Sequence, residues 1–180
     1  MKEKIISIIN QKGGVGKTTT VINLAAGLSL IGKKVLVIDL DPQGNATTGL
    51  GLSNLENSEK SIYSVLNGMK QISDVIEKTK FNNLDLITSN VDLSGLEVET
   101  AGDNRRAFIL KEKLTAYLND SREDYSHILI DCPPSLSLLT IMALVTSDSL
   151  LVPLQTEFFA LEGVTQLIKT IDRIKNNLNP

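Results

Sequence analysis

The chain has 180 residues, of which 42% are hydrophobic and 22% charged, a composition typical of a globular protein with its own core. Its net charge is −3, so no overall positive field indicates nucleic-acid binding, although an acidic total still allows a local basic patch. A single cysteine, Cys132, excludes an internal disulfide and fits a reducing cytoplasm. No hydrophobic run approaches the roughly 20 residues of a membrane span, and the first residues lack a signal-peptide pattern, so we expect neither a membrane span nor secretion.

Short β-branched runs alternate with longer stretches of helical periodicity, which predicts an α/β fold with a mostly parallel sheet and helices on both faces. The predicted strands cover residues 5–9, 34–40, 84–87, 127–131 and 149–154. The predicted helices cover residues 21–31, 62–66, 105–118, 136–145 and 161–174. Residues 41–53 should form a long loop, and such length usually indicates function. The absence of repeats and linkers predicts one domain over residues 1–180.

A glycine-rich segment lies between the first predicted strand and the first predicted helix. It reads Lys12-Gly13-Gly14-Val15-Gly16-Lys17-Thr18-Thr19. Glycines allow successive backbone N–H groups to converge on phosphate oxygens, and the helix N-terminus adds partial positive charge. Lys17 can then reach the β- and γ-phosphates of a nucleotide, and the Thr18 hydroxyl can bind Mg²⁺. The common pattern has a further glycine where this chain has Gln11, yet the strand–loop–helix context favours a phosphate loop over a chance glycine-rich turn.

Three aspartates stand at the ends of predicted strands, where open α/β sheets bind their ligands. Asp39 and Asp41 end the second strand, and strand alternation places both side chains on the same side. Asp131 ends a hydrophobic strand, the usual position of an acid that holds Mg²⁺ through a bound water. For Asp39 a second interpretation stays open, in which its carboxylate caps backbone amides.

The segment at 12–19 resembles the deviant Walker A motif, K-G-G-x-G-K-[ST], of the ParA/MinD superfamily, whose fold is that of P-loop NTPases. In that superfamily the first lysine reaches the nucleotide of the opposing subunit, which implies that Lys12 acts in trans, as an arginine finger does. A solvated loop lysine is the alternative. Residues 41–45, D-P-Q-G-N, resemble the switch segment of the family, which implies that Asp41 orients or deprotonates the attacking water while Asp39 supports the Mg²⁺ side. Asp131 begins a segment that resembles the D-x-P-P motif of the family.

Residues 152–155, V-P-L-Q, and 160–163, A-L-E-G, resemble the chromosomal Soj-type members of this family. The resemblance implies an ATPase that uses ATP and Mg²⁺, forms an ATP-dependent homodimer, binds DNA non-specifically and responds to a ParB/Spo0J-type partner. It places the protein in the cytoplasm at the nucleoid. Family members usually continue beyond the last predicted helix, so the C-terminal part of the family fold, with its adenine and DNA contacts, is expected beyond residue 180.

Two other functions stay open at this stage. A metabolic P-loop ATPase or kinase would need a substrate pocket with its own specific residues, and the sequence offers none. A nucleotide-binding interaction module without hydrolysis is disfavoured by the presence of Lys12 and Asp41. GTP is disfavoured because no N-K-x-D-like segment reads guanine. The only histidine, His127, has no partners for a metal site, Cys132 is expected to pack in the core, and Arg105 and Arg106 are expected on a solvated face.

Overall fold

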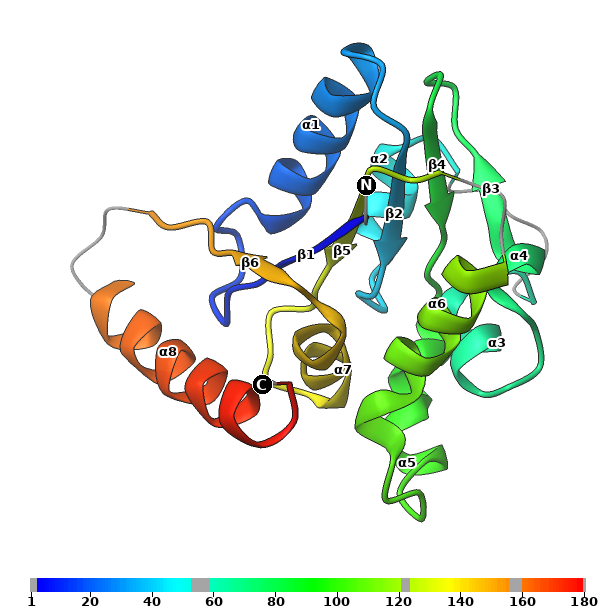
Figure 1. Cartoon of the computed structure of the whole chain (residues 1–180). Helices are drawn as coiled ribbons and strands as arrows, with labels where there is room; N and C mark the ends of the chain where they lie inside the picture. The colour runs from blue at the N-terminus through cyan, green and yellow to red at the C-terminus, as the bar shows by residue number, and fades with distance from the viewer. Residues whose placement is uncertain (1–2, 53–58, 121–123, 156–159, 180) are drawn as a thin grey trace.

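The computed structural model describes residues 3–52, 59–120, 124–155 and 160–179, which form a twisted sheet with helices on both faces (Figure 1). The strands are β1 (Lys4–Ile8), β2 (Val35–Asp39), β3 (Ile76–Lys78), β4 (Leu84–Ile87), β5 (His127–Asp131) and β6 (Ser149–Leu151). The helices are α1 (Lys17–Leu30), α2 (Asn45–Gly49), α3 (Ile62–Leu66), α4 (Ile72–Val75), α5 (Leu96–Glu99), α6 (Ile109–Asp120), α7 (Leu138–Thr146) and α8 (Ala160–Asn177), with 3-10 turns η1 (Val91–Gly95) and η2 (Arg106–Phe108). The strand order is β3-β4-β2-β5-β1-β6.

All neighbouring strands are parallel except β3, which runs antiparallel to β4. Parallel central strands explain why the sequence shows continuous hydrophobic runs, because both of their faces are buried. Alternation in β2 illustrates this: Leu36 and Ile38 pack in one core, while Val35 and Val37 pack in the other. α1 covers the second face, whereas α3, α6, α7 and α8 cover the first (Figure 1). The predicted α/β fold with a mostly parallel sheet is confirmed.

The sequence predicts a loop over residues 41–53. This prediction is wrong for the middle part, where Asn45–Gly49 forms the short helix α2. The helix follows Gly44, which has a φ of 63°, a conformation that favours glycine. Buried Ala46 and Leu50 attach it to the protein, and the carboxylate of Asp39 accepts bonds from its backbone. Five residues cannot form a stable helix by propensity alone, so tertiary contacts determine this element.

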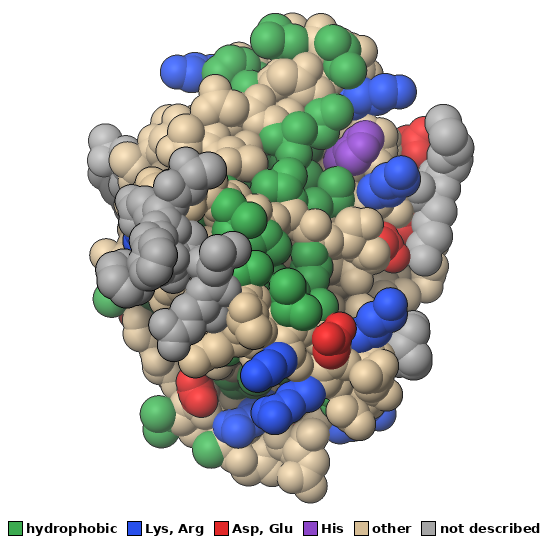
Figure 2. Space-filling model, turned by 90° about the vertical axis from the view of Figure 1, so that its left-hand side faces the viewer, with side chains coloured by type: hydrophobic (Ala, Val, Ile, Leu, Met, Phe, Trp, Pro, Cys, Tyr) green, Lys and Arg blue, Asp and Glu red, His purple; other side chains and the backbone are tan. Residues whose placement is uncertain are grey.

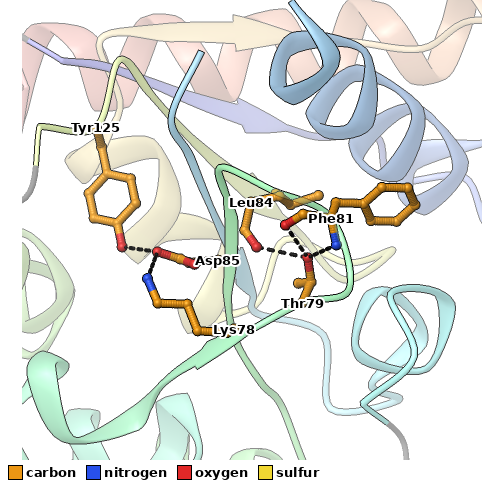
Figure 3. Close-up of polar contacts among 6 residues, drawn as sticks. All are labelled: Lys78, Thr79, Phe81, Leu84, Asp85 and Tyr125. Atoms are coloured by element: carbon orange, nitrogen blue, oxygen red, sulfur yellow. Dashed lines mark hydrogen bonds and ion pairs between the residues drawn. The ribbon is translucent and has the colours of Figure 1, made fainter. Parts of the chain in front are cut away.

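The antiparallel strand β3 was not predicted. A polar cluster holds it against β4, at the opposite end of the sheet from the phosphate loop (Figure 3). Asp85, which is 3% exposed, accepts hydrogen bonds from the Tyr125 hydroxyl at 2.7 Å and from Lys78 Nζ at 2.8 Å. Burial raises the pKa of Tyr125 well above its usual range, and the hydrogen bond to the adjacent Asp85 acts in the same direction. Thr79 closes the β3–β4 turn by donating to the Leu84 carbonyl. The cluster thus joins β3, β4 and the segment before β5 through one buried carboxylate.

Several predicted boundaries shift by a few residues. The helix predicted over 105–118 is a 3-10 turn followed by α6, and the strand predicted over 149–154 ends at Leu151. The buried helix predicted over 136–145 begins at Leu138. The strands at 84–87 and 127–131 and the helix at 62–66 are confirmed at both ends.

β6 forms one edge of the sheet, and hydrophobic side chains gather in a band over the face that β6 and α8 present (Figure 2). Leu150 and Leu151 are half-buried, and Leu154 beyond the strand is 56% exposed. This edge is therefore covered less completely than the central strands. None of the helices that the structure describes is long and hydrophobic enough to cross a membrane.

Candidate functional site

The glycine-rich loop occupies the turn between β1 and α1, as predicted. Gly14 and Gly16 have φ values of 74° and 91°, which residues with a Cβ rarely adopt. Apart from chain neighbours, no atom lies within 4 Å of a Cβ built on Gly13, Gly14 or Gly16, and these glycines line an open hollow. Gly16 also precedes the first residue of α1, which directs the positive end of the helix dipole into the same space. The loop therefore has the geometry of an anion cradle.

Lys17 is the first residue of α1 and is only 7% exposed, which is unusual for a lysine. Its Nζ donates to the Lys12 carbonyl at 3.2 Å, so its side chain curls back over the loop. Burial lowers the pKa of Lys17, while Asp131 and Asp41 act in the opposite direction. The ammonium group thus lies at the loop carbonyl and within the electrostatic influence of two acids, where a phosphate could also bind it.

Asp131 ends β5 and is fully buried, yet neither of its side-chain oxygens has a hydrogen-bond partner among the residues that the structure describes. Its pKa is raised to about 7, mainly by burial and to a smaller extent by the neighbouring acids Asp39 and Asp41. Thr18 and Lys17 favour the ionised form, although the Thr18 hydroxyl does not reach hydrogen-bond geometry. Buried carboxylate oxygens are rarely left unpaired in native proteins. A cation, or a water bound to one, would satisfy them.

Asp39 ends β2 directly beside Asp131, with which it is paired in register, but its surroundings differ completely. Its Oδ2 accepts from Thr47 N at 2.8 Å and Thr47 Oγ1 at 2.7 Å, and its Oδ1 accepts from Asp41 N at 3.2 Å. Burial nevertheless raises the pKa of Asp39 to about 6, because desolvation outweighs these bonds. These contacts match the second interpretation of the sequence, in which Asp39 caps backbone amides.

Asp41 follows β2 by two residues and is 7% exposed. Its Oδ1 accepts from Gln43 N at 3.0 Å, and its carbonyl accepts from Gly44 N at 2.9 Å, so the side chain is held in a tight turn. The turn presents Asp41 to a hollow of about 420 Å³ at the carboxyl ends of the strands. The hollow is lined by Gly13, Gly14, Gly16, Lys17, Thr18, Thr19, Asp41, Asn45 and Pro134. The structure thus brings the loop and Asp41 to one cavity.

Lys12 and Val15 complete the loop in different ways. Lys12 is exposed, and its N–H donates to Asn10 Oδ1 at 2.9 Å. Val15 is buried against the body of the protein, which anchors the tip of the loop. The side chain of Lys12 therefore belongs to the outer surface of the site, where a second subunit could be reached.

Two residues without a predicted role hold the loop from its other side. Asn10 Nδ2 donates to the Pro153 carbonyl at 2.8 Å, and Gln155 Nε2 donates to the Gly14 carbonyl at 3.2 Å. Both bonds join the phosphate loop to the segment after β6. The V-P-L-Q sequence at 152–155 was a signal for this segment, but contacts across 141 and 143 positions cannot be seen in it. Of the following A-L-E-G sequence, residues 160–162 have no described side chains.

The sequence predicts no functional role for Cys132, His127 or Arg105. Cys132 is buried in the hydrophobic core, where burial raises the pKa of its thiol. Burial lowers the pKa of His127, and Lys4 and Lys33 lower it further. Arg105 pairs with Glu112 on an exposed surface. Within the described ranges no three His, Cys, Asp or Glu residues could hold a metal ion together. Mg²⁺ typically needs no such cage, because it keeps waters and uses substrate phosphates with one or two protein oxygens.

The fold and the loop together define a P-loop nucleotide-binding protein of the α/β class. Over residues 3–180 the sequence matches the family described as an AAA domain. It is 48% identical to the chromosome partitioning protein ParA of Caulobacter vibrioides (strain NA1000 / CB15N) over 177 residues, which cover 98% of this chain and 65% of that protein. It is also 48% identical to the sporulation initiation inhibitor protein Soj of Bacillus subtilis (strain 168) over 176 residues, which cover 98% and 68%. The chain belongs to the ParA/Soj family, and it spans only about two thirds of the length of these relatives.

Solved structures resemble the chain over nearly its whole length. A cobyrinic acid a,c-diamide synthase from Mycobacterium smegmatis, with bound ATP analogue and magnesium, superposes with a TM-score of 0.91 at 36% identity, covering 99% of this chain and 71% of that one. A plasmid partition protein from Borrelia burgdorferi superposes with a TM-score of 0.85 at 33% identity, covering 99% and 76%. The chain therefore shares its fold with these two structures, one of which contains an ATP analogue and magnesium.

Proposed function

We propose that this chain is the nucleotide-binding part of a ParA/Soj-type partitioning ATPase, which binds Mg²⁺ and ATP in the hollow and hydrolyses ATP there. The observation that carries the proposal is the pair of unpartnered, buried oxygens of Asp131 beside a positively charged phosphate loop. Such a carboxylate costs stability unless a ligand completes it. The relative named as a chromosome partitioning protein and the neighbour with ATP analogue and magnesium support the same assignment.

Residues 13–19 would bind the phosphates. The open backbone of Gly13, Gly14 and Gly16 offers N–H groups, Val15 would add its own N–H between them, and Thr18 and Thr19 extend the contact into the first turn of α1. Lys17 would supply the main side-chain contact, exchanging the Lys12 carbonyl for phosphate oxygens. Its lowered pKa would return toward the ordinary value when the anionic ligand arrives.

The Thr18 hydroxyl and the Asp131 carboxylate would hold Mg²⁺. Thr18 lies at the phosphate loop, and both carboxylate oxygens of Asp131 lack a hydrogen-bond partner among the described residues. Mg²⁺ would neutralise charge that develops on the phosphates during transfer. Asp39 was predicted to support this side of the site as well. That role would require it to exchange at least one of its three present hydrogen bonds. We therefore propose that Asp39 holds the segment that carries Asp41 and does not bind the metal.

Asp41 would orient or deprotonate the attacking water. It is the acid that lines the hollow, and its carboxylate keeps lone pairs free beyond the one Gln43 N–H that it accepts. A positioned carboxylate of this kind typically contributes a factor of about 10²–10⁴ to the rate.

Lys12 would act on the nucleotide of an opposing subunit in an ATP-dependent homodimer. Lys17 and the backbone amides already serve the phosphates of the same subunit, so an exposed second lysine on the loop has no evident use in cis. Two anionic nucleotides facing each other in a cleft would repel without a cation between them. In the whole protein such a dimer would bind DNA non-specifically at the nucleoid, and a ParB/Spo0J-type partner would stimulate hydrolysis.

A metabolic enzyme is the second candidate, because one superposed structure is named as a cobyrinic acid a,c-diamide synthase. The relative named as a chromosome partitioning protein is more similar in sequence, at 48% against 36% identity. The behaviour of Lys12 separates the two candidates, since a monomeric metabolic enzyme has no need of a cation supplied in trans.

The test compares wild type with Lys17→Ala and Lys12→Ala. Lys17→Ala should abolish ATP binding in calorimetry while leaving the thermal unfolding transition in place. Lys12→Ala should bind ATP as a monomer but lose both turnover and dimerisation in light scattering with a slowly hydrolysed ATP analogue. Unchanged ATP affinity in Lys17→Ala would contradict the phosphate-loop assignment. Normal dimerisation and turnover in Lys12→Ala would favour the metabolic alternative. If wild type does not dimerise, the comparison requires a longer form of the protein.

A further inference from the structure

Thr47 is a buried polar residue, 6% exposed, in the short helix α2. It does not line the hollow, and the sequence assigned it no role. Its N–H donates to Asp39 Oδ2 at 2.8 Å, and its hydroxyl donates to the same oxygen at 2.7 Å. The hydroxyl also accepts from Ser89 N at 3.0 Å. One side chain therefore uses both its donor and an acceptor position inside the protein.

These bonds connect three elements at the carboxyl end of the sheet. Asp39 ends β2, Thr47 belongs to α2, and Ser89 follows the neighbouring strand β4. The end of β4 is itself fixed, because Thr88 accepts from Ile62 N at 2.8 Å and donates to the Lys60 carbonyl at 2.8 Å. Thr47 thus links α2 to the ends of two adjacent parallel strands, β2 and β4.

The same carboxylate that holds Thr47 also holds Asp41. Asp39 Oδ1 accepts from Asp41 N at 3.2 Å, which fixes the start of the turn, while Oδ2 fixes Thr47 beyond its end. Within the turn, Gly44 N donates to the Asp41 carbonyl at 2.9 Å. Asp39 therefore holds both ends of the segment that carries Asp41, and at the far end the Thr47 hydroxyl supplies one of the two hydrogen bonds and the only link to Ser89 N that the described residues of this segment show.

We propose that Thr47 is a positioning residue for Asp41: its hydroxyl fixes α2 against β2 and β4, and so sets where the Asp41 carboxylate meets the attacking water. The inference rests on the proposed ATPase function. Misplacing a reacting group by about 1 Å can lower a rate about 100-fold. Phosphate binding depends on the glycine-rich loop at residues 12–19, so loss of the Thr47 hydroxyl should leave the nucleotide affinity nearly unchanged.

Substitutions at Thr47 separate the hydroxyl from the shape of the side chain. Thr47→Val keeps the volume but removes the hydroxyl, which leaves the buried Ser89 N–H without its acceptor. Thr47→Ser keeps the hydroxyl and should restore function. The adjacent Thr48 is exposed on the same helix, so Thr48→Val is a matched control. Thr47→Ala removes the hydroxyl without adding a methyl group to the polar site, and serves if the valine variant is poorly folded.

Steady-state kinetics and hydrogen exchange test the proposal together. Thr47→Val should lower kcat about 10- to 100-fold while the ATP affinity changes less than about twofold. Thr47→Ser and Thr48→Val should stay near wild type. In the nucleotide-free protein, amide exchange at Asp41, Thr47 and Ser89 should accelerate in Thr47→Val but not in Thr48→Val. The double variant Asp39→Asn/Thr47→Val should lose less than the two single losses combined, because both changes break the hydrogen bond between the Thr47 hydroxyl and Asp39.

A folded Thr47→Val or Thr47→Ala variant with wild-type kcat would overturn the proposal. So would additive losses in the double variant, or equal losses of affinity and kcat that serine does not rescue. Failure of the proposed function gives a different result, namely a wild-type chain that neither binds nor hydrolyses ATP. The exchange comparison does not depend on nucleotide, so unchanged exchange at Ser89 would contradict the role of the hydroxyl even then.

Discussion

The ends of β2 and β5 lie side by side, and each strand closes in a fully buried aspartate, yet the two carboxylates have opposite surroundings. Asp39 accepts three hydrogen bonds from the segment that follows it. Asp131 accepts none from any residue that the structure describes. The difference separates two uses of a buried acid: a satisfied carboxylate holds the protein together, and an unsatisfied one is completed by a ligand.

Burial raises the pKa of both groups, to about 6 for Asp39 and about 7 for Asp131. Hydrogen bonds to Asp39 limit its shift, whereas Asp131 has only the nearby Thr18 and Lys17 to oppose desolvation. Asp41 lies between these two cases, since it is partly held by Gln43 N and opens into the hollow.

The largest expected effect follows from Asp41→Ala. The variant should hydrolyse ATP about 10²–10⁴ times more slowly than wild type, because a positioned base contributes about that factor. Its ATP affinity should stay close to normal, since Lys17 and the loop amides are unchanged. Turnover assays together with calorimetry measure both quantities. If Asp41→Ala hydrolyses ATP like wild type, Asp39 becomes the candidate base and the comparison above is wrong.

Asp131→Asn should lower turnover about 10- to 100-fold, the usual cost of disturbing a partner of a metal site. Because the loss arises from weaker metal binding, excess Mg²⁺ should recover part of it. The unfolding transition of the nucleotide-free variant should not fall, since the substitution removes a buried charge that has no described partner. A marked loss of stability in Asp131→Asn would show that this carboxylate is structural.

Asp39→Asn should have a smaller effect on turnover, about tenfold, because it acts on Asp41 only through the position of the turn. An amide has one acceptor oxygen, so it cannot serve both the Asp41 N–H and the two donors of Thr47. The response to Mg²⁺ should be unchanged. Asp85→Asn is the matched control, as a buried and hydrogen-bonded carboxylate at the other end of the sheet.

The smallest expected effect is on the pH dependence of stability. Both carboxyls bind their proton more tightly in the folded chain, since their pKa values are raised from 3.8 to about 6 and about 7. Their contribution to stability is therefore complete below pH 3.8 and is lost as the pH rises through these values. In Asp131→Asn, the free energy of unfolding should no longer fall as the pH rises toward about 7 because of this carboxyl. Denaturant titrations of nucleotide-free protein at several pH values measure this free energy. An unchanged profile in Asp131→Asn would contradict the raised pKa.

The sequence predicts the phosphate loop and the three acids because local patterns determine them. A β-branched run fixes β5 and its terminal Asp131, and glycines with Lys17 fix the loop. The contrast between Asp39 and Asp131 is not local. It depends on Thr47, eight positions from Asp39, and on Ser89, 42 positions from Thr47, both in parts of the chain that gave a weak or incorrect pattern.

Two of the short elements that the sequence did not predict, α2 and β3, share a physical cause. α2 and β3 are short, with five and three residues, so intrinsic propensity cannot specify them. Tertiary contacts do so instead: Asp39 holds α2, and Asp85 holds Lys78 of β3. A sequence pattern records neither contact, because each joins a residue to a partner on another element.

The most direct test of the account is the Mg²⁺ dependence of nucleotide affinity in wild type, Asp131→Asn, Asp39→Asn and Asp85→Asn. Calorimetry with a slowly hydrolysed ATP analogue, with Mg²⁺ and with a chelator, gives this dependence for each protein. We predict that Mg²⁺ raises the affinity of wild type, Asp39→Asn and Asp85→Asn alike, and that the gain falls about 10- to 100-fold in Asp131→Asn. A full gain in Asp131→Asn, or its loss in Asp39→Asn, would contradict the assignment of the metal to Asp131.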